Sequence, residues 1–160
     1  MDESLIGESL VDDKFENPVE ARKKAMDYLA RREHGRVELV EKVARFGFDE
    51  AVADDAVAQL VDENLQSDER YVEAFIASRI NQGKGPVKIR AELRERGIGG
   101  SVIDIALEDA DQDWYASAVL VREKKFGVER PKDFNEKARQ MRFLQSRGFD
   151  TDQIQSAVSA

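Results

Sequence analysis

The sequence predicts an all-α protein made of three tandem three-helix repeats, which we expect to form an elongated, curved rod. The main observation is a short helical pattern, closed by a glycine and a large apolar residue, that occurs three times in 160 residues. The closing glycines are Gly47, Gly97 and Gly148, at nearly equal spacing along the chain. Self-similarity at a fixed period is the signature of repeat architectures. Few β-branched runs alternate with period two, as strands would require.

Each repeat glycine has a conformational reason to stand at the end of a helix. A helix commonly ends with a residue in the left-handed conformation, which glycine adopts without a Cβ clash. The next residue, in "RFGF", "ERGI" and "SRGF", is apolar and can pack back on the last turn. Small or apolar residues also align before and after each glycine. The second helix of each repeat is therefore predicted to end at its glycine.

Capping residues and apolar spacing predict the other helices. Ser67 is a good cap for a helix that begins at Asp68, and Gly85 followed by Pro86 suits the start of the next helix. Apolar residues recur at intervals of three and four in the third helices. We place first helices at 19–32, 68–81 and 113–125, second helices within 34–48, 83–98 and 135–149, and third helices at 50–63, 101–110 and 151–158. The predicted repeats are 18–65, 66–111 and 112–160, after an acidic leader, 1–17, that we expect to be disordered.

Charge alternates with the predicted helices. The chain has a net charge of −8, yet segment 49–69 has eight acidic and no basic residues, and segment 114–147 has nine basic and four acidic residues. If the repeats stack in register, one side of the rod is basic and another is acidic. Such a body can engage polyanions on one side and stay soluble. The same charges are also typical of ordinary solvated helix surfaces.

No catalytic or metal-binding pattern is visible. The chain has no cysteine, so it has no thiolate zinc site, and its one histidine, His34, is interpreted as a capping or packing residue. "GKGP" at Gly83–Pro86 lacks the spacing and the preceding strand of a phosphate-binding loop. We expect no enzyme activity, no cofactor and no metal. Without a long apolar stretch or a secretory signal, a cytoplasmic protein is the natural expectation.

Three stretches of the chain resemble a known family. They are "YLARREHGRVELVEKVARFGF", "DERYVEAFIASRINQGKGPVKIRAELRERGI" and "REKKFG…KARQMRFLQSRGF". They closely resemble the RecX regulatory proteins of bacteria, and the resemblance covers about residues 19–158. The middle stretch is the most specific, because it matches without interruption. RecX proteins are built from tandem three-helix repeats, so the resemblance implies the same fold as the periodicity.

The resemblance implies a non-enzymatic regulator. RecX proteins bind RecA, the recombinase that forms helical filaments on single-stranded DNA, and they suppress its strand exchange, its ATP hydrolysis and its stimulation of LexA cleavage. A member would lie in the filament groove, inhibit the recombinase, ATPase and coprotease activities of RecA, and modulate DNA repair and the SOS response. We expect a monomer, and the resemblance leaves a weak direct contact with DNA open.

Two other functions fit the sequence. Three-helix units with a basic helix can resemble helix-turn-helix domains, so the chain could be a DNA-binding module that acts on DNA directly. It could also be a helical scaffold with another partner. Dependence on RecA filaments distinguishes the RecA-binding regulator from the DNA-binding module. The module would bind naked DNA, with an affinity that falls steeply as salt rises.

The candidate partner-binding residues are basic and lie in the second and third repeats. Arg90 and Arg94 share one flank of the helix "PVKIRAELRER", beside a flank of Ile89 and Leu93 that we assign to the core. The whole predicted set is Lys84, Lys88, Arg90, Arg94, Arg122, Lys124, Lys125, Arg139 and Arg142. Such groups suit an acidic protein surface or phosphate. The aromatic residues of the first helices are interpreted as core rather than as platforms for bases; they are Tyr71, Phe75, Trp114, Tyr115 and Phe126.

Overall fold

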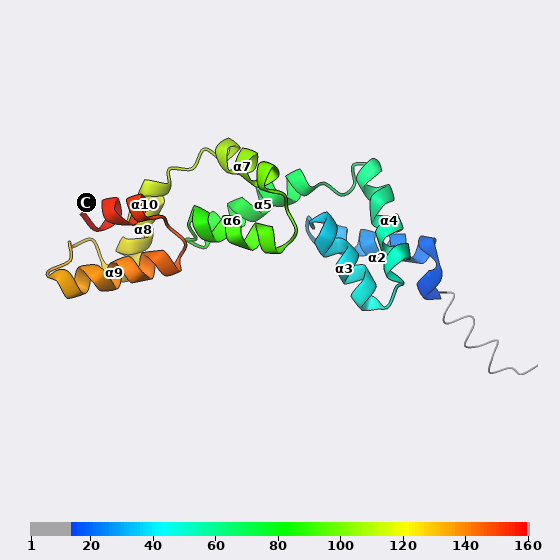
Figure 1. Cartoon of the computed structure of the whole chain (residues 1–160), viewed down its shortest axis with the longest axis horizontal. Coiled ribbons are helices and arrows are strands. Elements are labelled where there is room, and N and C mark those ends of the chain that lie inside the picture. The colour runs from blue at the N-terminus through cyan, green and yellow to red at the C-terminus, as the bar shows by residue number, and fades with distance from the viewer. Residues whose placement is uncertain (1–13, 160) are drawn as a thin grey trace, which may run out of the picture. The chain divides into compact units, whose positions relative to one another are not determined.

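The computed structural model describes residues 14–159, and within this range the chain forms helices and no strand (Figure 1). The helices are α2 (Pro18–Arg31), α3 (Arg36–Phe46), α4 (Glu50–Asp62), α5 (Asp68–Asn81), α6 (Pro86–Glu95), α7 (Gly100–Asp109), α8 (Trp114–Phe126), α9 (Phe134–Ser146) and α10 (Thr151–Ser159). The all-α prediction is confirmed, and the helices lie within about one residue of the predicted ranges; α9, for example, begins at Phe134, one residue before its predicted range. The expected disorder of residues 1–13 concerns residues outside the described range.

The chain packs as two units. The first consists of Met1–Tyr71 with Arg96–Ile98, and the second consists of Val72–Glu95 with Gly99–Ala160. Helix α5 thus begins in the first unit and continues in the second, and the turn that follows α6 belongs to the first unit.

In the first unit, α2 and α3 both pack against α4 around one apolar core. The helix starts are set by side-chain caps. Asn17 Oδ1 accepts a hydrogen bond from the backbone N–H of Val19 at 2.9 Å, and Asp49 Oδ1 accepts one from Ala51 at 2.9 Å. The buried core residues are Ala21, Ala25, Leu39, Val43, Phe48, Ala53, Ala56, Val57 and Leu60. Alanine at so many of these positions lets the helices approach closely.

Phe15 belongs to the predicted leader, 1–17, and lies in the described part of the chain. Its ring packs edge-on against Phe48, with ring centroids 5.4 Å apart, and its carbonyl accepts a hydrogen bond from the N–H of Asp49 at 3.1 Å. A methyl group at Gly47 would lie 2.7 Å from the Phe15 ring. Phe15 therefore packs over the closing turn of the first repeat, at Gly47 and Phe48.

In the second unit, α8, α9 and α10 pack against one another, and α6 packs against α7 (Figure 1). The side chains of Asp113 and Asp133 cap α8 and α9 by accepting hydrogen bonds from Ala116 and Glu136. One core cluster of this unit consists of Ala118, Leu144, Phe149, Ile154, Ala157 and Val158. Ile89 and Leu93 of α6 are fully buried, as the sequence predicted.

The repeat glycines have the backbone conformation that the sequence predicted. The φ angles are +135° at Gly47, +82° at Gly97 and +96° at Gly148. The residue that follows each of them is buried, with 5% or less of its surface exposed; these residues are Phe48, Ile98 and Phe149. All three glycines thus have positive φ at a helix end: Gly47 directly follows α3, whereas Gly97 and Gly148 each stand one residue further beyond the ends of α6 and α9.

Candidate partner-binding surface

The start of α6 is fixed to the turn that follows α9, within the second unit. The N–H of Gly85 donates to the carbonyl of Arg147 at 2.8 Å, and the N–H of Val87 donates to the carbonyl of Gly148 at 2.9 Å. The first N–H groups of a helix have no partner within the helix, so these carbonyls satisfy them. A methyl group at Gly85 would lie 2.5 Å from the carbonyl atoms of Gly148, so glycine is required on both sides.

Arg147 fixes the preceding turn in the same place. Its Nε donates to the carbonyl of Gly83 at 3.4 Å, and its Nη2 donates to the carbonyl of Gln82. The guanidinium is thus held by carbonyl oxygens and forms no ion pair with a carboxylate among residues 14–159. Its positive charge therefore remains uncompensated.

A groove of about 580 Å³ lies where the end of α5, helix α8 and the end of α9 meet. Four of its lining residues are basic: Lys84, Lys124, Lys125 and Arg147. Its apolar lining consists of Ile80, Leu120, Val121 and Phe143. None of the lining residues, all of which the structure describes, is acidic. We call this feature the basic groove; it combines uncompensated positive charge with aliphatic surface.

Lys84 is the most constrained of the predicted site residues in the groove. Its Nζ donates to Glu92 Oε1 at 3.0 Å, and Arg79 Nε donates to Glu92 Oε2 at 2.9 Å. Burial alone would raise the pKa of Glu92, but the hydrogen bonds from Arg79 and Lys84 lower it below its usual value. Glu92 thus joins the end of α5, the following turn and α6, and its carboxylate partly neutralises the charge of Lys84.

The predicted residues of α6 differ in their surroundings. Lys88 lies against Gly148, and its Nζ donates to the carbonyl of Ser146 at 3.3 Å. Arg90 forms an ion pair with Asp104 of α7. Arg94 is exposed and forms no ion pair with the residues in the described range. Among the predicted residues of α6, only Arg94 could bind a partner without first breaking an ion pair or hydrogen bond within the described part of the chain.

Arg122 is not on the surface. It is 2% exposed, its Nη1 donates to the carbonyl of Glu129 at 3.2 Å, and its Nε has no hydrogen-bond partner in the described protein. Gln140 of α9 is also buried, and neither of its amide atoms has a hydrogen-bond partner among residues 14–159. Arg122 faces the interior because it follows Ala118 by one helical turn, on the face that packs toward α9 and α10. We therefore leave Arg122 out of the candidate surface.

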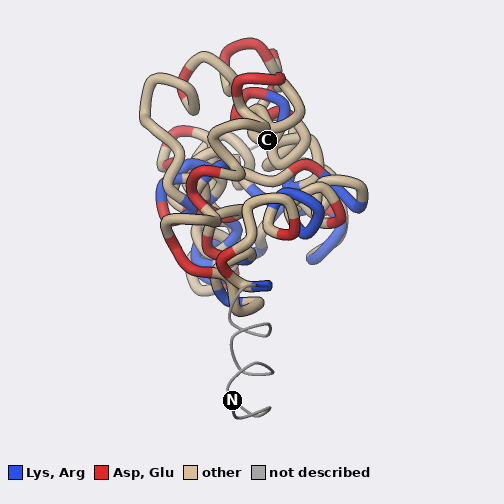
Figure 2. Tube along the Cα trace, turned by 90° about the vertical axis from the view of Figure 1, so that its right-hand side faces the viewer, with Lys and Arg blue, Asp and Glu red and all other residues tan. Residues whose placement is uncertain are grey.

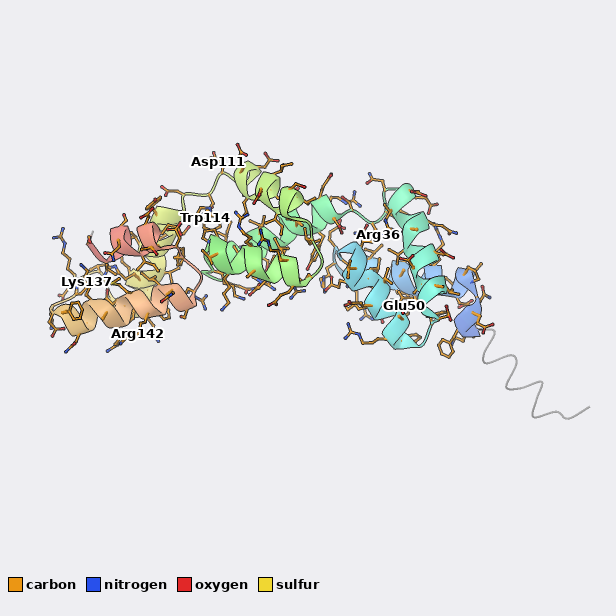
Figure 3. The ribbon with its side chains drawn as sticks, viewed as in Figure 1. Arg36, Glu50, Asp111, Trp114, Lys137 and Arg142 are labelled. Carbon is orange, nitrogen blue, oxygen red and sulfur yellow. The ribbon has the colours of Figure 1, made fainter. Side chains whose placement is uncertain are left out.

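The other predicted residues of the third repeat are exposed. Lys124 and Lys125 lie in the last turn of α8, and Arg139 and Arg142 lie on α9, where Figure 3 labels Arg142. Lys125 Nζ lies 5.6 Å from the ring centroid of Phe143, and the Arg139 guanidinium lies 5.3 Å from that of Phe126. Figure 2 shows how basic and acidic residues are distributed along the chain trace. The candidate surface therefore consists of the basic groove with Arg139 and Arg142 on the neighbouring helix.

The sequence prediction included only the three lysines of the groove, so it missed Arg147 and Leu120 among others, and it misplaced one aromatic residue. Arg147 precedes a repeat glycine and was read as part of a helix end, and Leu120, which is 66% exposed, had no charge to attract notice. The signal available for Leu120 was its place one turn before Lys124 on the same helix face. Tyr71 and Phe75 are core residues, as predicted, but Tyr115 is 49% exposed.

His34 is a packing residue of the first unit, as the sequence indicated. It is 1% exposed, its Nδ1 lies 3.0 Å from the carbonyl oxygen of Arg32, and Lys42 Nζ lies 2.9 Å from its Nε2. Burial lowers the pKa of His34, and the positive charge of Lys42 acts in the same direction. The two contacts fit the tautomer in which Nδ1–H donates to the carbonyl of Arg32 and Nε2 accepts from the ammonium of Lys42.

The described part of the chain offers neither a metal centre nor a membrane span. Residues 14–159 contain no group of three or more histidine, aspartate or glutamate side chains placed to hold a metal ion. In the same range no helix has both the length and the apolar character needed to cross a bilayer.

Comparison with protein families matches nearly the whole described chain. The first three-helix domain of RecX matches residues 21–60, the second matches 67–107 and the third matches 111–158. The chain is 47% identical over 139 residues to the regulatory protein RecX of Halorhodospira halophila, covering 87% of this chain and 86% of that one. It is 43% identical over 145 residues to the regulatory protein RecX of Pseudomonas entomophila, covering 91% and 94%.

Two solved structures show the same fold. The crystal structure of RecX from Lactobacillus salivarius superposes with a TM-score of 0.73 at 22% identity, covering 89% of this chain and 94% of that one. Another crystal structure, of a regulatory protein RecX, superposes with a TM-score of 0.75 at 22% identity, covering 100% and 79%. With three matching domain models and close relatives along most of its length, this chain belongs to the RecX family.

Proposed function

We propose that this protein is a non-enzymatic regulator that binds RecA and RecA filaments on single-stranded DNA. Membership of the RecX family is the observation that carries the proposal, because the resemblance implies RecA as the partner. Binding would inhibit the recombinase, ATPase and coprotease activities of RecA. In the cytoplasm, a monomer of this protein would thereby limit recombinational repair and the SOS response.

The exposed cations of α8 and α9 support this proposal. Lys124, Lys125, Arg139 and Arg142 are all exposed. Guanidinium and ammonium groups bind carboxylates and phosphates through charge-assisted hydrogen bonds, and a RecA filament on DNA presents both groups. The proposed interface is therefore the candidate surface, the basic groove with Arg139 and Arg142. Lys88, Arg90 and Arg94 of α6 are proposed to extend it.

Co-sedimentation with RecA filaments tests the proposal. The protein should sediment with RecA assembled on circular single-stranded DNA and should lower the rate of ATP hydrolysis by RecA. Arg139→Glu with Arg142→Glu should weaken both effects while the helical circular-dichroism signal is retained. The matched control is Asp54→Lys with Asp55→Lys on α4, where both residues are exposed and the surface is acidic.

Naked single-stranded DNA distinguishes the alternative function. A DNA-binding module would bind it without RecA, with an affinity that falls steeply as salt rises. Equal binding to naked DNA and to filaments would contradict the RecA proposal and favour the DNA-binding module. Loss of inhibition in the Asp54 and Asp55 control, but not in the arginine variant, would place the interface on the acidic helices instead.

A further inference from the structure

We infer that the basic groove binds an acidic peptide segment that carries an aliphatic side chain. The inference deepens the proposed function, on which it rests, because the segment would belong to the RecA partner. It concerns the chemistry of the occupant, which follows from the charge and the apolar lining of the groove.

The charge of the groove fits a run of carboxylates. Lys124, Lys125 and Arg147 form no ion pair with any residue of the described chain, and no acidic side chain lines the groove beside them. Lys84 adds a fourth cation that already shares Glu92. Uncompensated cations of one sign in a concave surface concentrate an anionic partner and speed its association.

The apolar lining fits an aliphatic side chain. Leu120 is 66% exposed and stands on α8 one turn before Lys124, so a carboxylate held by Lys124 brings the neighbouring residue of a peptide onto Leu120. Ile80 and Val121 line the same groove. Burying such a side chain contributes affinity that a purely ionic contact in water lacks.

The same lining disfavours a nucleic acid as the occupant. Sequence-tolerant binding of single strands relies on aromatic side chains on which bases stack. Phe143 is the one aromatic residue among those that line the groove. Its ring packs against Phe126 at an interplanar angle of 89°, and Lys125 Nζ lies over it. The one aromatic ring of the lining is thus already engaged by Phe126 and Lys125, whereas Leu120 is exposed.

A binding measurement with synthetic probes tests the inference. The probe is a short fluorescein-labelled peptide of glutamate, aspartate and leucine, followed by fluorescence anisotropy with the full-length protein. Comparison probes are the same peptide with glutamine and asparagine for the acidic residues, the peptide with serine for leucine, and an oligothymidylate of the same length. The acidic leucine peptide should bind tightest, and its affinity should fall as salt rises.

Variants locate the binding in the groove. Lys124→Glu with Lys125→Glu should weaken binding of the acidic leucine peptide by about tenfold or more. Leu120→Ser should weaken it severalfold and abolish the preference over the serine peptide. Lys132→Glu with Lys137→Glu makes the same change of charge in the same unit but outside the groove, and it should leave the affinity unchanged.

The outcomes separate this inference from the proposed function. If the neutral peptide binds as tightly, if the oligothymidylate binds tighter and loses affinity in the Lys124 and Lys125 variant, or if no peptide binds, the inference is wrong. Sedimentation with RecA filaments under any of those results would leave the proposed function standing. Peptide binding by a protein that does not sediment with RecA would instead overturn RecA as the partner.

Discussion

Gly148 and Lys88 are in contact through their backbones. A methyl group at Gly148 would lie 2.2 Å from the Cβ of Lys88 and 2.8 Å from its backbone nitrogen. The equivalent residue of the second repeat, Gly97, faces Val37 in the first unit, where a methyl group would lie 2.8 Å from Cγ2 of Val37. Each glycine therefore serves two purposes: it ends its own helix in a left-handed conformation and admits the start of another second helix.

Replacement of the repeat glycines should destabilise the protein to different degrees. Gly97→Ala should lower the free energy of unfolding by about 1–2 kcal/mol, since φ is positive and Val37 can shift. Gly148→Ala should cost more, about 2–4 kcal/mol, because the clash includes the backbone of Lys88. Urea unfolding followed by circular dichroism measures both.

Gly99 provides the control for these variants. Its φ is −68° and a methyl group there would meet nothing within 4 Å. Gly99→Ala should therefore change the free energy of unfolding by less than about 0.5 kcal/mol. Equal midpoints for all three variants would contradict the role assigned to the repeat glycines.

The contacts of Glu92 should contribute more to the free energy of unfolding than an ordinary surface ion pair does. Glu92→Gln removes the charge that Arg79 and Lys84 share, at a site where the three side chains are only 18–21% exposed. We expect a loss of about 1–3 kcal/mol. A double-mutant cycle with Arg79→Met measures the coupling between the two residues, and a coupling near zero would show that the pair contributes nothing to stability.

The stability of the first unit should depend on pH through His34. Burial holds the pKa of His34 below 6.5 in the folded protein, so the unfolded chain binds a proton that the folded chain rejects. Stability is therefore full above about pH 6.5 and falls as the pH drops below that value. Between pH 7.5 and 5.5 the loss should reach about 1.4 kcal/mol at most. His34→Gln should remove this loss, and an equal loss in both proteins would exclude His34 as its source.

Replacement of Arg90 and of Arg94 should affect the stability of the protein differently. Arg94→Glu should leave the thermal unfolding midpoint unchanged, because Arg94 is exposed. Arg90→Glu should cost about 0.2–1 kcal/mol, since its ion pair with Asp104 is 38% and 59% exposed. Asp104→Arg should restore the stability of Arg90→Glu.

If both arginines belong to the interface, each single variant also weakens the inhibition of RecA, and unchanged inhibition by Arg94→Glu would remove this helix from the surface.

The features that could be predicted from the sequence are local ones. The left-handed conformation of Gly97 and the burial of Ile89 and Leu93 depend on glycine chemistry and on helical spacing within a few residues. Arg122 was misplaced because its sequence neighbours, Lys124 and Lys125, are exposed, and only the packing of α8 against α9 and α10 decides which side of the helix is covered.

The basic groove depends on residues that are distant in the sequence. Arg147 donates hydrogen bonds to the carbonyls of Gln82 and Gly83, from which it is separated by 65 and 64 residues along the chain. No spacing rule relates such residues. The predicted lysines of the groove were found by their charge, but the aliphatic wall at Leu120 required the arrangement of α5, α8 and α9.

The hydrogen bonds at the start of α6 make two backbone amides sensitive to the separation of the second and third repeats. Amide hydrogens in the first turn of a helix usually exchange with solvent quickly, because they lack partners. The amides of Gly85 and Val87 are instead bonded to the carbonyls of Arg147 and Gly148. Their deuterium uptake therefore measures how often the second and third repeats separate, while the amides in the middle of α6 report the unfolding of the helix itself. A partner that holds these repeats together would slow exchange at two known positions.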